Sequence, residues 1–136
     1  MPLFNLTKKS RNLINPLKKK MAEEIYSIEK FKSIIEAERA RANRNNHNLS
    51  LLFFDMDSSG QEDNTTVHLI RIIKHRIRCV DKVGWYDDQR IGVILPYTSK
   101  KGATQLAENI CESLNQTVHK PVCTVYTYPN DKLNLN

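Results

Sequence analysis

Two short groups of charged residues have the types and spacing that nucleotide or metal binding requires. Arg78 and Asp81 stand three residues apart, in the segment Arg78-Cys79-Val80-Asp81. An arginine guanidinium can grip a guanine O6/N7 edge or a phosphate in a bidentate manner, and an aspartate can accept hydrogen bonds from the guanine N1 and N2 donors. An Arg and an Asp at this spacing can also form an ordinary surface ion pair. The spacing alone therefore leaves a ligand site and a structural pair open.

The second group is Asp55 and Asp57, at the end of an apolar run. Side chains two residues apart in a strand point to the same face, and carboxylate oxygens are ligands that suit magnesium. Acidic residues also commonly end a strand and open a turn. We favour this second interpretation and keep the metal pair as a weaker hypothesis.

The elements that must position these residues centre on the stretch RCVDKVGWYDDQRIGVILP, residues 78–96. Two runs rich in β-branched and aromatic residues, Lys82–Tyr86 and Arg90–Leu95, flank the short polar link Asp87-Asp88-Gln89. Two such runs at this separation are typical of a β-hairpin. We therefore expect a hairpin turn at residues 87–89.

Helical and strand patterns alternate around this hairpin. Apolar residues recur at helical spacing in three segments, and two further segments have the composition of strands. The run 49–54 is almost continuously apolar, which predicts a strand covered on both faces. Strand, helix, hairpin, helix and strand follow the ferredoxin-like βαββαβ plan of an α+β domain, preceded by one extra helix. The expected elements are helices at 28–43, 67–77 and 103–114 and strands at 49–54 and 122–128.

Charge and length define the organisation of the chain. Residues 1–20 hold six of the 21 Lys and Arg residues and no acidic residue, so 15 basic residues remain against the 15 acidic ones. We expect a basic leader at 1–22, one domain at 23–130 and a polar tail at 131–136. The leader is predicted to be solvated or to lie on an anionic membrane surface or a partner.

Several classes of function are disfavoured by composition. No apolar run is long enough to span a bilayer and no signal peptide is recognised, so we expect a cytoplasmic protein, membrane-proximal if the leader binds lipid. The body lacks a basic patch with interleaved aromatic residues, so no nucleic acid partner is expected. The cysteines are odd in number and form no C-x-x-C pair, so we expect reduced, buried side chains without disulfides or zinc: Cys79, Cys111 and Cys123.

Residues 24–128 resemble the GGDEF domains of bacterial diguanylate cyclases. The resemblance is carried by the helix that ends ERAR, the strand LSLLFFDMD, the stretch 77–96 and the segment TSKKGATQLAENI after it. It implies a nucleotide-cyclase-type sheet with helices. It also implies that Asp55 occupies the position of a magnesium ligand, and that Arg78 and Asp81 match the RxxD site that binds cyclic di-GMP in this family.

The five signature positions depart from the family pattern. They hold Asp87, Asp88, Gln89, Arg90 and Ile91. An amide and a cation stand where acidic side chains complete the metal site, and two aspartates replace the glycines that let the backbone approach a phosphate. Residues 58–64 also replace the elements that shape the guanine pocket. We therefore expect no cyclase activity, no cofactor and no magnesium.

Three hypotheses follow from these observations. The leading one is a catalytically inactive GGDEF-like domain that regulates by contacting a protein partner or a second copy of itself. The alternative is a cyclic di-GMP receptor that uses Arg78 and Asp81. The third, of a different class, is an enzyme that retains metal-dependent nucleotide chemistry through Asp55 and Asp57.

Overall fold

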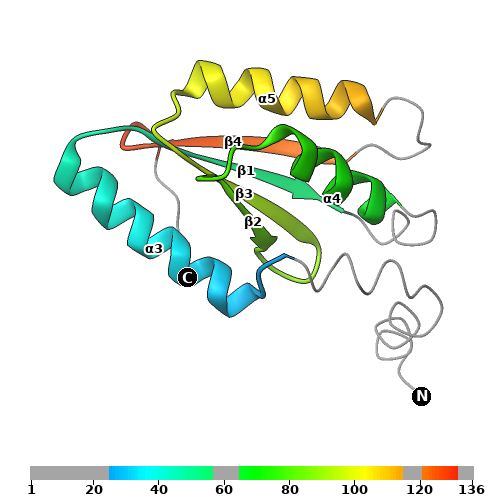
Figure 1. The fold of residues 1–136 in the computed structure, drawn as a ribbon, viewed down its shortest axis with the longest axis horizontal. Helices are drawn as coiled ribbons and strands as arrows, with labels where there is room; N and C mark the ends of the chain where they lie inside the picture. The colour runs from blue at the N-terminus through cyan, green and yellow to red at the C-terminus, as the bar shows by residue number, and fades with distance from the viewer. Residues whose placement is uncertain (1–24, 57–64, 115–120, 132–136) are drawn as a thin grey trace.

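A computed structural model describes residues 25–56, 65–114 and 121–131 of the chain. The order of elements is helix, strand, helix, hairpin, helix and strand, as predicted (Figure 1). The basic leader 1–22, Asp57, the loop 58–64 and residues 132–136 of the predicted tail lie outside the described residues. The elements are α3 (Ile28–Asn45), β1 (Leu49–Asp55), α4 (Thr65–Arg76), β2 (Lys82–Trp85), β3 (Arg90–Pro96), α5 (Lys100–Ser113) and β4 (Val122–Tyr128).

The four strands form one antiparallel sheet in the order β2-β3-β1-β4. The central strand β1 pairs with both β3 and β4, so that Leu52 lies opposite Val93 on one side and Val125 on the other. This order is the one that the βαββαβ plan produces, because each helical crossover leaves room for a strand between the two that it connects. The predicted ferredoxin-like fold is confirmed.

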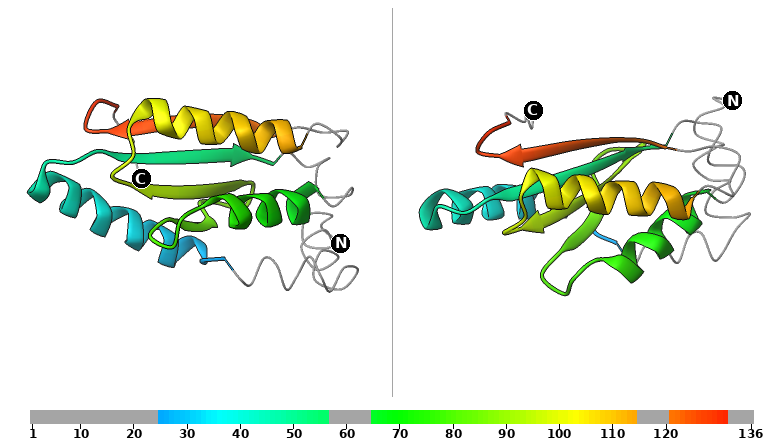
Figure 2. Two further views of the ribbon diagram at one scale, coloured as in Figure 1. Left: turned by 45° about the horizontal axis from the view of Figure 1, so that its top comes forward. Right: turned by 90° about the horizontal axis from the view of Figure 1, so that it is seen from above.

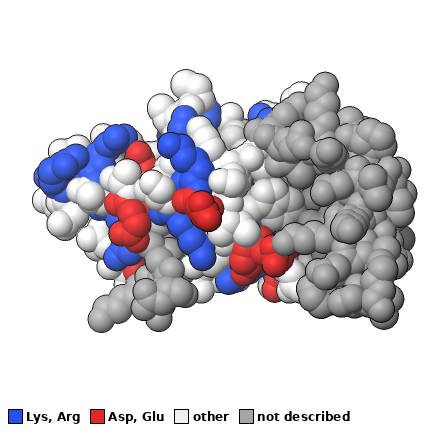
Figure 3. Space-filling view, turned by 90° about the horizontal axis from the view of Figure 1, so that it is seen from below, with Lys and Arg blue, Asp and Glu red and all other residues white. Residues whose placement is uncertain are grey.

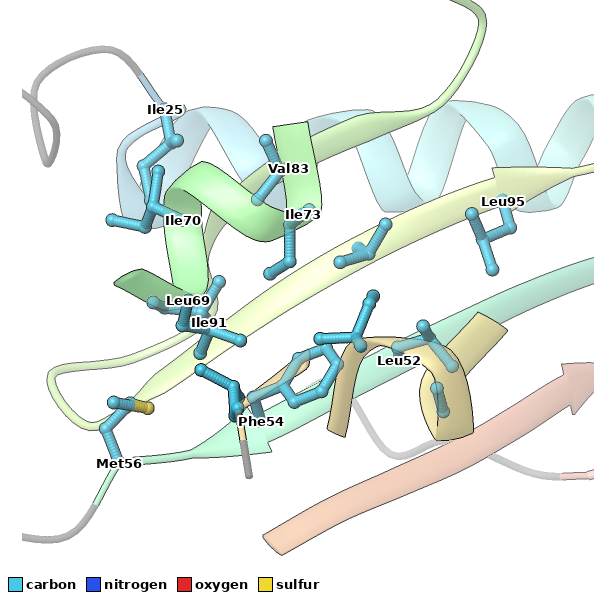
Figure 4. Close-up of a cluster of buried hydrophobic side chains, with 14 of the residues drawn as sticks. Ile25, Leu52, Phe54, Met56, Leu69, Ile70, Ile73, Val83, Ile91 and Leu95 are labelled. Atoms are coloured by element: carbon cyan, nitrogen blue, oxygen red, sulfur yellow. The ribbon is translucent and has the colours of Figure 1, made fainter. Parts of the chain in front are cut away.

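Helices cover both faces of the sheet. Helix α3 lies against one face, and α4 and α5 lie against the other (Figures 1 and 2). Successive β1 side chains alternate between the two layers, so that Phe53 packs toward α3 and Phe54 packs toward α4 and α5. Figure 4 shows the second of these cores, with Phe54 and Leu52 from β1 beneath Ile70 and Ile73 of α4. The continuous apolar run of β1 therefore reflects burial on both faces.

Side-chain caps determine where two of the helices begin. The Ser27 hydroxyl accepts a hydrogen bond from the Lys30 amide at 3.3 Å and begins α3. The Ser99 hydroxyl accepts one from the Gly102 amide at 3.2 Å and begins α5. Apolar periodicity placed the start of α5 at residue 103, three residues late, because the first turn after the cap is polar and contributes nothing to the periodic stripe.

The expectation of buried cysteines is wrong for one of the three. Cys79 is exposed, whereas Cys111 and Cys123 are partly buried. Cys79 lies in the turn between α4 and β2. Burial, together with the nearby Cys111, raises the pKa of the Cys123 thiol to about 12, so this thiol stays protonated at neutral pH. None of the described helices is long and apolar enough to cross a bilayer.

Candidate functional site

The turn between β2 and β3 is closed by the side chain of its own first residue. One carboxylate oxygen of Asp87, Oδ1, accepts hydrogen bonds from the amides of Gln89 at 2.9 Å and Arg90 at 2.8 Å. The other, Oδ2, accepts from the guanidinium of Arg90 at 2.8 Å. Asp88 and Gln89 are exposed at the tip of this turn. The amides of Gln89 and Arg90 are therefore already occupied by an anion that belongs to the chain.

The Arg90 guanidinium is held over an aromatic surface on the α3 face of the sheet. Its central carbon lies 4.7 Å from the centroid of the Tyr86 ring and 5.9 Å from that of Phe53. The Lys32 ammonium of α3 lies 4.9 Å from the centroid of the same Tyr86 ring. The hydrogen bond to Asp87, opposed by partial burial, raises the pKa of Arg90. Sequence analysis did not find Lys32, since nothing in its local pattern separates it from other surface lysines of an amphipathic helix.

Asp55 ends β1 directly opposite Arg90 in the strand register. Its negative charge is the smallest of the contributions that raise the pKa of Arg90. Asp57, the other predicted ligand, lies outside the described residues. Among the residues that the structure describes, no three His, Cys, Asp or Glu side chains gather closely enough to hold a metal ion. The described residues of the predicted metal pair fit magnesium poorly. Only Asp55 of this pair is described, and the Arg90 cation lies opposite it in the register.

The last signature position belongs to the core. Ile91 is fully buried among the side chains that connect the sheet with α4 and α5 (Figure 4). Because successive side chains of β3 alternate between faces, Ile91 points away from the face that holds Arg90. The five signature positions thus divide into an ion-paired turn and one core residue.

Replacing Asp87 with Asn is expected to remove part of the acid sensitivity of the fold. Burial alone would raise the pKa of Asp87, but the guanidinium and the two amides outweigh it and lower this pKa below its usual value. A carboxylate with a lowered folded-state pKa stabilises the protein above the unfolded pKa of about 3.9, and this contribution is lost as the pH falls further. Urea unfolding at pH 7, 5 and 3 should show wild type and Asp87→Asn converging toward pH 3. A difference in the free energy of unfolding that does not change with pH would contradict the lowered pKa of Asp87.

Arg78 and Asp81 lie at the opposite end of the hairpin from this turn. Pro96, whose carbonyl accepts from Arg78, is six residues along β3 from Arg90, or about 20 Å at the usual rise of a strand. The structure therefore places Asp55 opposite Arg90, the partner of Asp87, and separates these residues from the Arg78–Asp81 pair. The two predicted sites are distinct.

Arg78 and Asp81 form a clamp in which the carboxylate is buried and the arginine side chain is half-exposed. The Asp81 carboxylate is 2% exposed and accepts three hydrogen bonds from Arg78: from the amide at 2.8 Å, from Nε at 3.1 Å and from Nη2 at 2.8 Å. Nη2 also donates to the Pro96 carbonyl at 2.9 Å and to the Thr98 hydroxyl at 2.8 Å. These bonds connect the loop before β2 with the loop after β3. Of the two interpretations left open by the spacing, this geometry favours the structural pair.

The α3 face carries charges of both signs. Figure 3 shows Lys and Arg side chains along this face with Asp and Glu between them. Within α3, Arg39 pairs with Glu36 at 3.4 Å and Arg41 with Glu38 at 2.9 Å. A hollow of about 430 Å³ opens between α3 and the end of β4, lined by Arg39, Leu49, Leu51, Tyr126, Tyr128, Pro129 and Asp131. Its acidic group, Asp131, is already bonded to the Thr127 amide and to Lys100.

Comparison with known proteins identifies the architecture. No family model and no curated protein matches the sequence. A DGC protein from Thermotoga maritima matches with a TM-score of 0.71 and 21% identity, over 82% of this chain and 87% of that one. The GGDEF domain of DgcB from Caulobacter crescentus, solved in complex with c-di-GMP, matches with a TM-score of 0.58 and 12% identity, over 76% and 68% of the two chains.

The fold is that of GGDEF domains. The diguanylate cyclase SiaD from Pseudomonas aeruginosa, solved in complex with its activator SiaC, shares this GGDEF fold. It matches with a TM-score of 0.59 and 18% identity, over 91% of this chain and 52% of SiaD. Since a fold can host both catalysts and inert adaptors, the function of this GGDEF fold depends on its site residues.

Proposed function

We propose that this chain is a catalytically inactive GGDEF-like signalling domain that acts as a regulatory, protein-interaction module. The observation that carries this proposal is the Asp87–Arg90 ion pair, which closes the turn at the signature positions. This proposal includes both self-association and docking to another protein. The cytoplasmic location and the membrane contact of residues 1–20 stay predictions.

The argument against catalysis rests on charge. Phosphoryl transfer from a nucleoside triphosphate requires metal ions and donors placed where negative charge develops. The turn amides of Gln89 and Arg90 are bonded to the Asp87 carboxylate, which repels a phosphate instead of attracting one. On the other side, Asp55 lies opposite the Arg90 cation rather than in a group of carboxylates. The occupied turn amides and the cation opposite Asp55 each support, independently of the other, a loss of triphosphate binding.

The comparisons support a role in protein contact. SiaD, which matches this chain over 52% of its length, was solved as a complex with a protein activator, so a protein that contains a GGDEF fold can be regulated through protein contact. In this chain the sheet keeps a packed core on each of its two faces, whereas Gln89 and Arg90 replace the acidic residues of the signature. We therefore propose that this chain acts through contacts between its surface and another protein molecule.

Cyclic di-GMP binding is the alternative within the same family. The Caulobacter domain was solved with this ligand, and Arg78 and Asp81 match the RxxD pattern. Against it, a guanine would have to displace Arg78 from a carboxylate that is 2% exposed and already accepts three hydrogen bonds. The cost of exchanging these charge-assisted bonds disfavours the receptor function.

Catalysis is tested by incubating the full chain with GTP and with ATP in the presence of Mg²⁺ or Mn²⁺. Chromatography of the nucleotides is expected to show no product above a protein-free blank, while an active diguanylate cyclase assayed in parallel forms cyclic di-GMP. Metal-dependent product formation that is abolished by Asp55→Asn would overturn the proposal and favour retained nucleotide chemistry.

The receptor alternative is tested by calorimetric titration with cyclic di-GMP. Wild type is compared with Arg78→Ala and with Arg71→Ala, which removes an exposed arginine of α4 and serves as the matched control. We expect no saturable heat from any of the three. Saturable binding that is lost only in Arg78→Ala would replace the proposed function with that of a second-messenger receptor. Circular dichroism of each variant confirms that it is folded during the titration.

A further inference from the structure

The two edges of the sheet differ in how they are protected. On β2, residue 26 forms a bridge to the strand: the Tyr26 amide donates to the Val83 carbonyl at 3.1 Å, and the Trp85 amide donates to the Tyr26 carbonyl at 2.9 Å. On β4, no described helix or strand lies beyond the outer edge (Figure 2, right). An open edge is a ready template for pairing with another strand.

The direction of the β4 backbone groups follows from Thr127. Its amide donates to the Asp131 carboxylate at 2.9 Å, and its carbonyl accepts from the Asp131 amide at 2.7 Å, so both groups point away from β1. In an antiparallel strand, the residues whose backbone groups point to the same side alternate. The amide and carbonyl groups of Val125 and Cys123 therefore point outward as well.

This open edge is short and bounded at both ends. At one end, Asp131 satisfies both outward groups of Thr127. At the other end stands Pro121, which has no amide hydrogen to donate. Between these limits, Cys123 and Val125 present the outward donors and acceptors of the described part of β4. Thr124 lies at the centre of this segment.

We propose that a second copy of this chain pairs with β4 in antiparallel orientation, with the two-fold axis at Thr124. Cys123 of each copy then lies opposite Val125 of the other, and the paired residues exchange about four main-chain hydrogen bonds. Val122, which is 70% exposed in the single chain, lies beside the half-buried Tyr126 of the second copy. The two sheets join into one continuous antiparallel sheet.

The register excludes the neighbouring alternatives. Centring the axis on Cys123 would pair Val125 with Pro121, which lacks the required donor. Centring it on Val125 would pair Cys123 with Thr127, whose outward groups are bonded to Asp131. The axis at Thr124 uses both available residues of each copy and no occupied group. The edge is therefore self-complementary.

Charge favours a copy of the chain as the occupant. Residues 122–128 contain no charged side chain, so two copies bring no like charges together along the strand. Beyond residue 20 the chain has 15 basic and 15 acidic residues, so two bodies meet without net repulsion. A pair of short strands buries less than the roughly 1,200–2,000 Å² of a standard interface, so the dimer should be reversible and concentration-dependent. This inference rests on the proposed function, because it names the surface through which the module acts.

Disulfide trapping of full-length protein tests this arrangement. The background carries Cys79→Ser, Cys111→Ala and Cys123→Val, and Thr124→Cys is added to it. Residues that face each other in a non-hydrogen-bonded antiparallel pair have Cα atoms about 4.5 Å apart, within the range of a disulfide. Mild oxidation is expected to convert most of the Thr124→Cys protein to a covalent dimer on a non-reducing gel.

Val122→Cys in the same background is the matched control. Its cysteine is also exposed on β4, but the two-fold axis places the two copies of residue 122 about 13 Å apart, too far for a disulfide. It is expected to stay monomeric under oxidation. Equal crosslinking of both variants, or none of Thr124→Cys, would overturn the proposed register.

Thr124→Lys in the native sequence gives a second, independent measurement. The exposed side chain of Thr124 can be replaced without loss of packing in the monomer, but the dimer would place two ammonium groups opposite each other. Sedimentation velocity over a concentration series should show a dissociation constant raised about fivefold or more, while His68→Lys on α4 leaves it unchanged. Monomeric wild type at all concentrations would refute the dimer and leave the proposed function standing; GTP turnover would refute that function and leave the dimer standing.

Discussion

Gly84→Ala and Gly92→Ala are each expected to lower the free energy of unfolding by about 1–3 kcal/mol, because a methyl group at either position collides with the buried ring of Phe31. An ideal Cβ at Gly84 would lie 2.5 Å from Cδ1 of this ring, and one at Gly92 would lie 2.6 Å from Cε2. Phe31 is fully buried between α3 and the β2–β3 hairpin, so its ring cannot move away without disturbing the core.

Gly102→Ala is the control for the same chemical change. Gly102 is exposed in α5, and the nearest atom to its new methyl group would be Cγ2 of Thr98 at 3.3 Å, a contact that a shift of a few tenths of an ångström relieves. We expect the free energy of unfolding to stay the same or to rise by up to about 1 kcal/mol, because alanine favours the helix. Urea unfolding of all three variants at constant m-value gives the comparison.

A smaller side chain at residue 31 should relieve the collision. In the pair Phe31→Leu and Gly92→Ala, the double variant is expected to lose less stability than the sum of the two single changes, since the shorter side chain leaves room for the methyl group. Strict additivity would show that the cost of Gly92→Ala arises elsewhere in the strand.

Asp81→Asn is expected to lower the free energy of unfolding by about 2–4 kcal/mol, because it removes the charge from a buried carboxylate with three donors around it. The new amide nitrogen would face an N–H donor of Arg78 instead of accepting from it. Arg78 would also lose the anchor that holds it against the Pro96 carbonyl and the Thr98 hydroxyl. Thermal and urea unfolding measure the effect.

Asp87→Asn provides a matched control. Asp87 pairs with an arginine three residues later at 2.8 Å, as Asp81 pairs with one three residues earlier, but both members of the Asp87–Arg90 pair are 40% exposed. Solvent screens such a pair, so its loss should cost less than about 1 kcal/mol at pH 7. Equal losses from the two variants would show that burial does not distinguish the two pairs.

The clamp also affects how ligand experiments should be interpreted. Arg78→Ala leaves the Asp81 carboxylate buried without its guanidinium partner, and a buried charge without a partner is destabilising. Loss of cyclic di-GMP binding in this variant would therefore count only if the protein is folded at the titration temperature. Half of the Arg78 side chain is exposed, which allows water to reach the pair and limits this cost.

The sequence alone determined the order of elements, the hairpin at residues 87–89 and the burial of β1 on both faces. These features depend on residues that are close in the chain: the period of apolar side chains, a polar link between two strands and an uninterrupted apolar run. The resemblance to GGDEF domains correctly predicted the fold, which the solved structures then matched. The loss of cyclase activity stays a prediction until the nucleotide assays are made.

Only the tertiary structure decided what the charged residues do. Spacing could not separate a ligand site from a clamp at Arg78 and Asp81, because the deciding contacts come from Pro96 and Thr98, about twenty residues further along the chain. The strand register likewise placed Asp55 opposite Arg90 and left β4 at the rim of the sheet. Contacts between distant segments depend on the packing of the whole fold, whereas the periodicity of side chains reflects only residues that are close in the chain. The sequence therefore identified the candidate residues, and the packing determined their partners.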